Sequence, residues 1–265
     1  MFRWPGVNDD DRLMLRRTFT EDAALYDRMR PGYPAAMFEH IPRGSRVLEI
    51  GCGTGQATVT LAGRGCAVTA VELGADMAAL ARRKLAPYAG VEVVNAAFEE
   101  WPLPPEPFDV VFAATSFHWL DPATRVGRSA DALRPGGRLA VVSTEHVAGG
   151  TEAFFAEVQR CYERWDPATP PGLRLTPASD IPYDSDEIDA SGRFAPVRFH
   201  RYEWDHAYTT REYLDLLSTY SGHRALPAEA RTGLLDCIAA LIDSRYGGHI
   251  VKRYLTQLAL ADRLG

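Results

Sequence analysis

Short apolar runs alternate with helical patterns along the first 165 residues of the chain. The runs at 46–50, 67–71, 91–94, 108–114 and 138–142 have the near-continuous apolar character of buried strands. Helical patterns lie between them, for example at 56–63 and in the Ala-rich segment 75–85. Alternation at this spacing predicts an α/β fold, a doubly wound parallel sheet with helices on both faces.

The C-terminal part of the chain is less regular. Residues 166–194 are rich in Pro, Ser and Asp and indicate a connecting segment with only short structure. Residues 197–204 and 249–260 alternate apolar and polar side chains as strands do, and amphipathic helices at 210–220 and 227–243 lie between them. We expect this strand pair to close the sheet, with the two helices as an insertion.

Composition narrows the classes of partner. The chain has 265 residues, 46% hydrophobic and 24% charged, which is typical of a globular protein and excludes disorder. Its formal net charge is −6 and its basic clusters are confined to 16–17 and 82–84, so we expect no nucleic-acid partner. Residues 1–11 show no secretion signal, and no run approaches the roughly 20 apolar residues of a membrane span. We therefore expect no membrane association.

The cysteines and histidines suggest no cross-link and no metal. Cys52, Cys66, Cys161 and Cys237 are separated by 14, 95 and 76 residues, without a CxxC pair, so their spacing suggests neither a zinc site nor a disulfide framework. No histidines have ligand spacing such as HExxH, and we predict no metal. A reducing cytoplasm is the simplest location for such a chain.

A glycine-rich loop joins the first predicted strand to the first helix. Gly51, Gly53 and Gly55 alternate with other residues, which lets the backbone turn sharply and present N–H groups to a ligand. Glu72 ends the next strand, 17 residues after Gly55, where a carboxylate can accept both hydroxyls of a ribose. Dinucleotide-binding loops read G-x-G-x-x-G, whereas this one reads G-x-G-x-G and follows Glu49, which disfavours pyrophosphate and favours an ammonium group. The loop predicts a nucleoside with a zwitterionic amino-acid tail, S-adenosylmethionine.

Five motifs occur in the order found in one enzyme family. They are 49–55 (EIGCGTG), Glu72, 97–99 (AFE), 108–111 (FDVV) and 133–139 (LRPGGRL). With this set the chain resembles the class I S-adenosylmethionine-dependent methyltransferases. Tyr26, residues 30–34 (RPGYP) and residues 115–122 (TSFHWLDP) are similar to the trans-aconitate methyltransferase-like branch of small-molecule enzymes. The resemblance implies a Rossmann-like sheet of seven strands with the last one antiparallel, which agrees with the closing strand pair.

The resemblance also implies roles for individual residues. The loop residues Gly51, Cys52, Gly53 and Gly55, next to Glu49, would pass the backbone around the methionine portion of S-adenosylmethionine. Glu72 would bind the ribose. Around the adenine would lie Leu73, Met77, Ala97, Phe98 and Glu99. Tyr26 and Arg30 would close over the cofactor, with Arg30 facing its carboxylate, and Thr115 completes the cofactor-binding set.

We expect the chain to consist of a lid segment and one domain with insertions. Residues 1–40 would form an N-terminal helical lid, and residues 41–265 the methyltransferase domain. Cap insertions at about 166–194 and 206–247 would form the wall of the acceptor site. Candidates for that wall are Tyr183, Trp204, Tyr220 and His223.

His118 follows the fourth strand at the edge where doubly wound sheets bind ligands, and it is flanked by Phe117 and Trp119. Its ordinary pKa suits a general base that takes the acceptor's proton. It could equally orient the acceptor or hydrogen-bond its own loop. We predict that Phe117, His118 and Trp119 contact the substrate, with His118 as the catalytic candidate.

The sequence therefore predicts an enzyme that moves the methyl group of S-adenosylmethionine to an oxygen, nitrogen or carbon of a small molecule and releases S-adenosylhomocysteine. Two alternatives remain open: an enzyme of this fold that uses the cofactor in a non-methylating reaction such as a cyclisation, and a non-catalytic binding module. We expect a monomer or homodimer whose partner is its small-molecule substrate.

Overall fold

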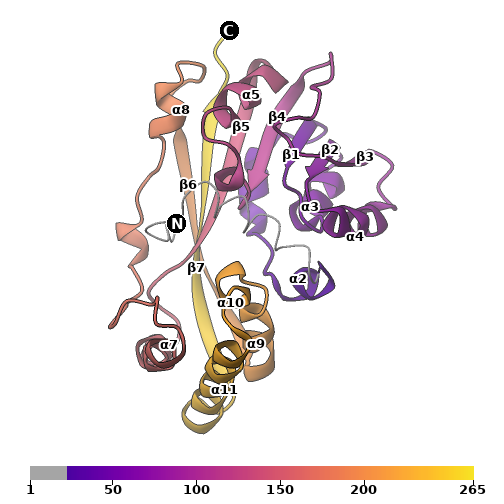
Figure 1. The fold of residues 1–265 in the computed structure, drawn as a ribbon. Helices are drawn as coiled ribbons and strands as arrows, with labels where there is room; N and C mark the ends of the chain where they lie inside the picture. Colours follow the sequence, from indigo (N-terminus) through magenta and orange to yellow (C-terminus); the bar gives the residue numbers. More distant parts are fainter. Residues whose placement is uncertain (1–22) are drawn as a thin grey trace.

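The structure is a computed structural model that describes residues 23–265 (Figure 1). Residues 1–22, which include much of the predicted lid and the basic pair at 16–17, lie outside the described residues. The strands are β1 (Arg46–Ile50), β2 (Ala67–Glu72), β3 (Val91–Asn95), β4 (Phe108–Ala114), β5 (Leu133–His146), β6 (Arg198–Thr209) and β7 (His249–Asp262). The α-helices are α2 (Ala23–Met29), α3 (Gln56–Gly63), α4 (Ala75–Leu85), α5 (Arg125–Ala132), α6 (Glu152–Glu157), α7 (Gln159–Trp165), α8 (Asp186–Ala190), α9 (Thr210–Leu217), α10 (Ser221–Arg224) and α11 (Ala228–Arg245). Three 3₁₀ helices are described: η1 (Ala35–His40), η2 (Phe117–Trp119) and η3 (Ala178–Asp180).

The strands form one seven-stranded sheet in the order β3-β2-β1-β4-β5-β7-β6. β1 to β5 are parallel, and β7 is antiparallel to both β5 and β6. The predicted α/β class and the antiparallel last strand are confirmed. β6 runs in the same direction as the parallel strands, so the helices that follow it lie at the carboxyl edge of the sheet.

The sheet is buried on both faces because successive side chains of its central strands point to opposite sides. In β1, Val47 packs in one core cluster with Phe38 and Leu61, from η1 and α3. Its neighbour Leu48 belongs to the cluster on the other face, which α5 and α8 cover. This two-sided burial is the reason why the parallel strands read as near-continuous apolar runs.

A helical cap stands at the end of the long β6–β7 pair, whose register is continuous from Arg198↔Leu260 to Thr209↔His249. Figure 1 shows α7, α9, α10 and α11 gathered beyond the glycine-loop end of the sheet. The cap, here defined as α6, α7 and α9–α11, has its own core, in which Phe154, Leu234 and Ile238 are fully buried. The cap is therefore a second packed layer and not a loose loop.

Several boundaries differ from the sequence prediction; β6, for example, continues to Thr209, beyond the predicted 197–204. β5 begins at Leu133, which pairs with Phe108 before a register shift, and the predicted strand 138–142 is the part beyond that bulge. The turn residues 135–137 thus lie inside the strand, because the bulge accommodates them. The helix predicted at 210–220 ends at Leu217, and Tyr220 precedes the separate turn α10.

The expectation of no disulfide is wrong. Cys161 of α7 and Cys237 of α11 form a disulfide across the cap, and their Cα atoms lie 5.8 Å apart. The two cysteines meet because α7 packs along α11, an arrangement that their separation of 76 residues does not reveal. Cys52 and Cys66 are free and buried.

Candidate active site

The glycine loop between β1 and α3 turns across the end of β2. The backbone N–H groups of Gly51 and Cys52 both donate to the carbonyl of Val71, at 2.8 and 3.4 Å. Gly51 has a φ of 67°, and a Cβ there would lie 2.6 Å from the Cβ of Ser116. Only glycine combines this backbone angle with so close an approach, so the loop is held against the segment that follows β4.

Glu72, the last residue of β2, accepts two backbone hydrogen bonds. Its Oε2 accepts from the N–H of Gly53 at 2.8 Å and its Oε1 from the N–H of Gly74 at 2.7 Å. The side-chain amide of Asn95 donates to the carbonyls of Glu72 and Leu73, at 2.8 and 2.9 Å. These contacts hold a carboxylate beside the glycine loop, at the sheet edge where doubly wound folds bind nucleosides.

A cavity of about 20 Å³ lies beside the glycine loop. Its lining comes from the loop, β1, the start of α3, the end of β4 and the region of α2, and consists of Tyr26, Tyr33, Glu49, Gly51, Cys52, Gly53, Gln56, Ala57, Ala114 and Thr115. The predicted cofactor residues among them are Tyr26, Glu49, Gly51, Cys52, Gly53 and Thr115. Tyr33, inside the RPGYP run, and Gln56, directly after Gly55, also line the cavity and are not among the predicted residues.

One carboxylate oxygen of Glu49 is buried in this cavity without a hydrogen-bond partner among residues 23–265. This oxygen is Oε2, and the residue is 2% exposed. Burial, together with the negative charge of Glu72, raises the pKa of Glu49 to about 8. A buried carboxylate oxygen without a partner is costly, and a bound ammonium group would supply the missing contact.

Thr115, directly after β4, is a non-glycine residue with a φ of 54°. Its Oγ1 hydrogen-bonds the hydroxyl of Tyr33 at 3.0 Å and donates to the carbonyl of Ala114 at 2.8 Å. Backbone strain of this kind is kept where the surroundings hold it, often at functional sites. The turn brings Thr115 into the cavity lining, and the next residues leave it.

Phe117, His118 and Trp119 form η2, and none of them lines this cavity. Phe117 packs in the core on the opposite face from Tyr33, with the guanidinium of Arg125 5.1 Å from its ring. The rings of His118 and Trp119 lie 4.8 Å apart, and both side chains are half-buried. Burial, with a smaller contribution from the charge of Arg125, lowers the pKa of His118 to about 4. His118 is therefore neutral at pH 7, but it is a weak base.

Helix α2 is fastened to the glycine loop and to α4 by one carboxylate. Asp27 Oδ1 accepts from the Thr54 hydroxyl at 2.7 Å and from Lys84 Nζ at 2.7 Å. The ring of Tyr26 comes within 3.9 Å of the position a Cβ on Gly53 would take. The helix therefore covers the loop, and its Tyr26 side chain occupies part of the space beside it.

Arg30, just beyond α2, links the loop region to the cap. Its guanidinium lies 4.9 Å from the ring centre of Tyr26 and 4.5 Å from that of Tyr220, and it donates to the carbonyl of Thr219 at 3.2 Å. Its buried Nε has no partner among residues 23–265. One donor of the fork is thus left for a ligand.

The residues predicted to surround adenine lie in the segments after β2 and β3. Met77 and Phe98 are buried, whereas Leu73 is 36% exposed. Glu99 Oε1 accepts from the backbone N–H of Asp121 at 3.3 Å. None of these residues lines the cavity at the glycine loop, so their predicted role stays a prediction.

Comparison with known proteins identifies the family. A family model for a methyltransferase domain matches residues 47–137, the stretch that carries the glycine loop and Glu72. An uncharacterized methyltransferase of Mycobacterium tuberculosis is 30% identical over 228 residues, which cover 85% of each chain. The chain belongs to the class I S-adenosylmethionine-dependent methyltransferases.

More distant relatives of the methyltransferase agree. An uncharacterized methyltransferase-like protein of Schizosaccharomyces pombe is 25% identical over 85% of this chain and 87% of its own. Among solved structures, a proposed type II methyltransferase from Anaeromyxobacter dehalogenans has a TM-score of 0.58 at 24% identity, covering 88% of this chain and 97% of that one. The second likeness shows a common fold. The trans-aconitate-like branch stays a prediction.

Two unpartnered polar atoms at this site fit the amino-acid tail of S-adenosylmethionine. Glu49 Oε2, in the cavity, suits its ammonium, and Arg30 Nε, which lies outside the cavity lining beside Tyr26, suits its carboxylate. Within residues 23–265, no three His, Cys, Asp or Glu side chains are placed to hold a metal ion. In the same range no helix is long and apolar enough to cross a membrane.

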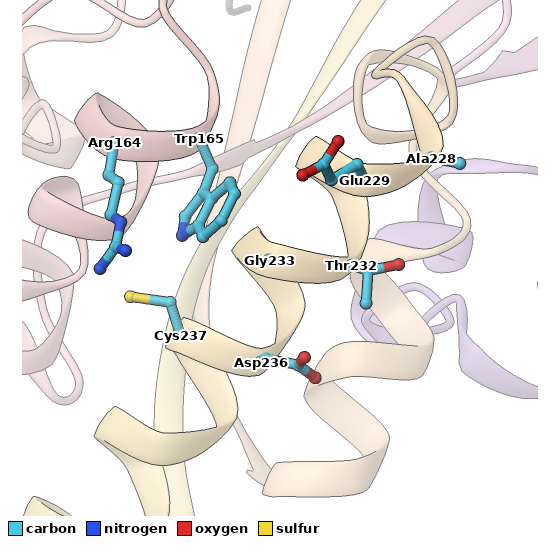
Figure 2. Close-up of a pocket in the computed structure, with 8 residues that line it drawn as sticks. All are labelled: Arg164, Trp165, Ala228, Glu229, Thr232, Gly233, Asp236 and Cys237. Atoms are coloured by element: carbon cyan, nitrogen blue, oxygen red, sulfur yellow. The ribbon is translucent and has the colours of Figure 1, made fainter.

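A larger hollow, of about 730 Å³, lies on the cap of the methyltransferase between α7 and α11 (Figure 2). Trp165 faces Gly233, and Cys237 points toward α7, to which its disulfide connects it. Arg164, Glu229 and Asp236 also line the hollow. It shares no residue with the cavity at the glycine loop, and its charged groups do not converge on one point, so size alone does not make it the active site.

Proposed function

We propose that this methyltransferase transfers the methyl group of S-adenosylmethionine to an oxygen, nitrogen or carbon atom of a small-molecule acceptor and releases S-adenosylhomocysteine. The observation that carries the proposal is the buried, unpartnered carboxylate oxygen of Glu49 beside a glycine loop that also holds Glu72. That pairing suits a ligand with an ammonium group and a ribose, and it does not suit a pyrophosphate.

The proposed cofactor contacts follow from these positions. Glu49 binds the ammonium group, Arg30 the carboxylate and Glu72 the ribose hydroxyls. Glu72 exchanges its hydrogen bond to the N–H of Gly53 for the ribose, and that N–H then faces the ligand. Small-molecule sites usually enclose several hundred Å³. A cavity of about 20 Å³ therefore has to widen, and α2 with Tyr26 is the element that moves away and closes again.

Positioning is the main work of the protein in this reaction. Bound S-adenosylmethionine supplies a sulfonium whose methyl group is already electrophilic. The chain holds the acceptor in line at near-contact distance, which removes most of the entropic barrier. Tyr26 and Tyr33, at the cavity wall, exclude water from the reacting atoms.

The cofactor assignment is tested by calorimetry with S-adenosylmethionine and S-adenosylhomocysteine. Both bind the wild-type protein. Glu72→Ala weakens binding at least about 100-fold, because two hydrogen bonds to a charged group are each worth about 1.5–3 kcal/mol. Glu92→Ala, which removes an exposed carboxylate of β3, leaves the affinity unchanged. Equal affinity of wild type and Glu72→Ala would overturn the assignment of Glu72.

Transfer itself is tested by incubating the protein with methyl-labelled S-adenosylmethionine and a fractionated metabolite extract. Label in a small-molecule product supports the proposal. Tight binding of the cofactor with no label in any fraction favours a non-methylating enzyme or a binding module. His118→Ala decides the general-base hypothesis for that residue: retained activity across the pH range removes it.

A further inference from the structure

Among residues 23–265, the ammonium of Lys252 beneath the cap has no acidic partner. Lys252 of β7 is 4% exposed, and its Nζ donates to the hydroxyl of Tyr220 at 3.0 Å. The same ammonium lies 5.3 Å from the ring centre of Tyr220 and 4.9 Å from that of Tyr254. Within the described part of the chain, Lys252 forms no ion pair. Its ammonium therefore lies over two tyrosine rings and donates a hydrogen bond to the hydroxyl of Tyr220.

A second cation reaches the same phenol from the cofactor side. The guanidinium of Arg30 lies 4.5 Å from the ring centre of Tyr220, and it donates a hydrogen bond to the carbonyl of Thr219, the residue before Tyr220. Its other aromatic neighbour, Tyr26, lines the cavity at the glycine loop. Tyr220, half-buried between β7 and the segment after α2, thus lies one side chain away from the proposed cofactor site.

The two cations distinguish Tyr220 from the tyrosines around it. Burial raises the pKa of Tyr220, but the charges of Lys252 and Arg30 and the hydrogen bond from Lys252 outweigh it and leave the pKa below its ordinary value. The remaining tyrosines that face it have raised pKa values because they are buried, and they are Tyr162, Tyr208, Tyr213 and Tyr254.

The nearby histidines are poor alternatives. The ring of His223 lies 5.8 Å from that of Tyr220, and its Nε2 is engaged by the hydroxyl of Tyr162 at 3.0 Å. Burial lowers the pKa of His223 to about 4, and that of His146, which also senses Lys252, to about 2. The phenol is the group in this cluster that its neighbours favour as an anion.

We propose that Tyr220 is the catalytic residue that takes the proton of the methyl acceptor, with Lys252 as the positioning residue that holds its oxygen. This inference rests on the proposed function. The acceptor's nucleophilic atom forms a bond to the methyl carbon while the electron pair of the carbon–sulfur bond stays on sulfur. The acceptor's proton goes to the phenolate oxygen, and the neutral phenol returns it to solvent before the next turnover.

The first test needs no acceptor. Ultraviolet difference titration near 295 nm follows phenolate formation by the 11 tyrosines of the full chain. We expect one tyrosine to ionise below the ordinary tyrosine range in the wild type and that early step to be missing in Tyr220→Phe. In Lys252→Met the early ionisation step moves to higher pH. In Lys252→Arg, which keeps the positive charge, the step stays at low pH. Identical titrations of wild type and Tyr220→Phe would refute the proposal.

The second test measures methyl transfer from labelled S-adenosylmethionine to the active extract fraction. Tyr220→Phe lowers kcat at least 100-fold, a usual loss for a removed proton acceptor, with KM within about threefold. Tyr213→Phe, which removes the hydroxyl of another buried cap tyrosine, changes kcat less than about threefold. In the wild type, kcat rises with pH through the early titration step, and in Lys252→Met that rise shifts to higher pH.

The two tests separate the possible failures. A Tyr220→Phe variant with full kcat and an unchanged pH profile overturns the role of Tyr220 while leaving the transferase activity intact. Absence of transfer by the wild type overturns the proposed function, and the base role falls with it. Calorimetry with S-adenosylmethionine shows that each variant is folded and binds the cofactor.

Discussion

Glu49→Gln removes a titrating group from the cofactor cavity at almost constant side-chain volume. The pKa of Glu49 is about 8 in the folded protein against an ordinary 4.5, so at pH 7 the native state holds a proton that the unfolded chain has released. The unfolded state is then favoured as pH rises, by about 1.4 kcal/mol for each pH unit above 4.5 until the folded pKa is reached. At pH 7 the wild type therefore loses about 3 kcal/mol of its free energy of unfolding. Glu49→Gln, which has no carboxyl at this position, does not lose it.

Thermal unfolding of the ligand-free protein measures this effect. At pH 7, Glu49→Gln melts roughly 6–12 °C above the wild type, given about 2–4 °C for each kcal/mol in a chain of this size. Near pH 4.5 the difference disappears, because the wild-type carboxyl is then protonated in the folded protein and half-protonated in the unfolded chain. Glu92→Gln, at an exposed position, shows no such dependence on pH. A stability gap of equal size at both pH values would refute the argument.

Glu49→Gln stabilises the ligand-free protein but weakens its binding of the cofactor. If the ammonium of S-adenosylmethionine draws Glu49 into its charged form, binding at pH 7 releases roughly 0.9 proton from a carboxyl whose pKa is about 8. Calorimetry in buffers of different ionisation enthalpy measures that number. Glu49→Gln releases no proton and binds about tenfold more weakly at pH 8, where the lost charged hydrogen bond is worth about 1.5 kcal/mol or more. Proton release that survives in the variant would assign it to another group.

Three further substitutions test contacts around the site and in the cap. Gly51→Ala places a Cβ 2.6 Å from that of Ser116 at a φ of 67°, so it lowers the free energy of unfolding by at least about 1 kcal/mol in denaturant titration; an unchanged midpoint would contradict the loop geometry. Cys161→Ser opens the link to Cys237 and lowers stability by about 4 kcal/mol in the chain-entropy account; four titratable thiols in the unfolded, unreduced wild type would show that the disulfide is absent. Asp27→Asn weakens the fastening of α2, so hydrogen exchange in 23–29 becomes faster than in the wild type; equal rates would exclude that role.

The sequence predicts the parallel half of the fold closely because its signals are local. β1, α3, α4 and β4 have the predicted boundaries, since each is a continuous apolar run or a helix bounded by glycine or proline. The start of β5 is missed because pairing across the sheet, between Phe108 and Leu133, extends that strand through a turn sequence. Local patterns do not report such pairing.

The cofactor side of the site is readable for the same reason, and the cap side is not. The glycine loop and Glu72 lie within one βαβ unit, so their spacing carries information. Lys252 occupies a polar position in a strand of alternating apolar and polar residues, and this pattern predicts an exposed side chain. In the structure the cap buries it. Its neighbours Arg30 and Tyr220 come from distant parts of the chain, and only the folded arrangement brings the three together.

The unbroken β6–β7 ladder has an evolutionary consequence. β5 accompanies β7 as far as Tyr254, and the last five pairs of the ladder, from Asp205↔Arg253 to Thr209↔His249, carry α9–α11 outward from the sheet on a two-stranded arm. The chain leaves and re-enters that arm at the pair Thr209↔His249. Whatever stands between those two residues can be replaced, lengthened or shortened while the Gly51–Gly55 loop stays as it is. Selection for a new acceptor can therefore act on the outer segment 210–248 while the inner scaffold continues to present the methyl donor.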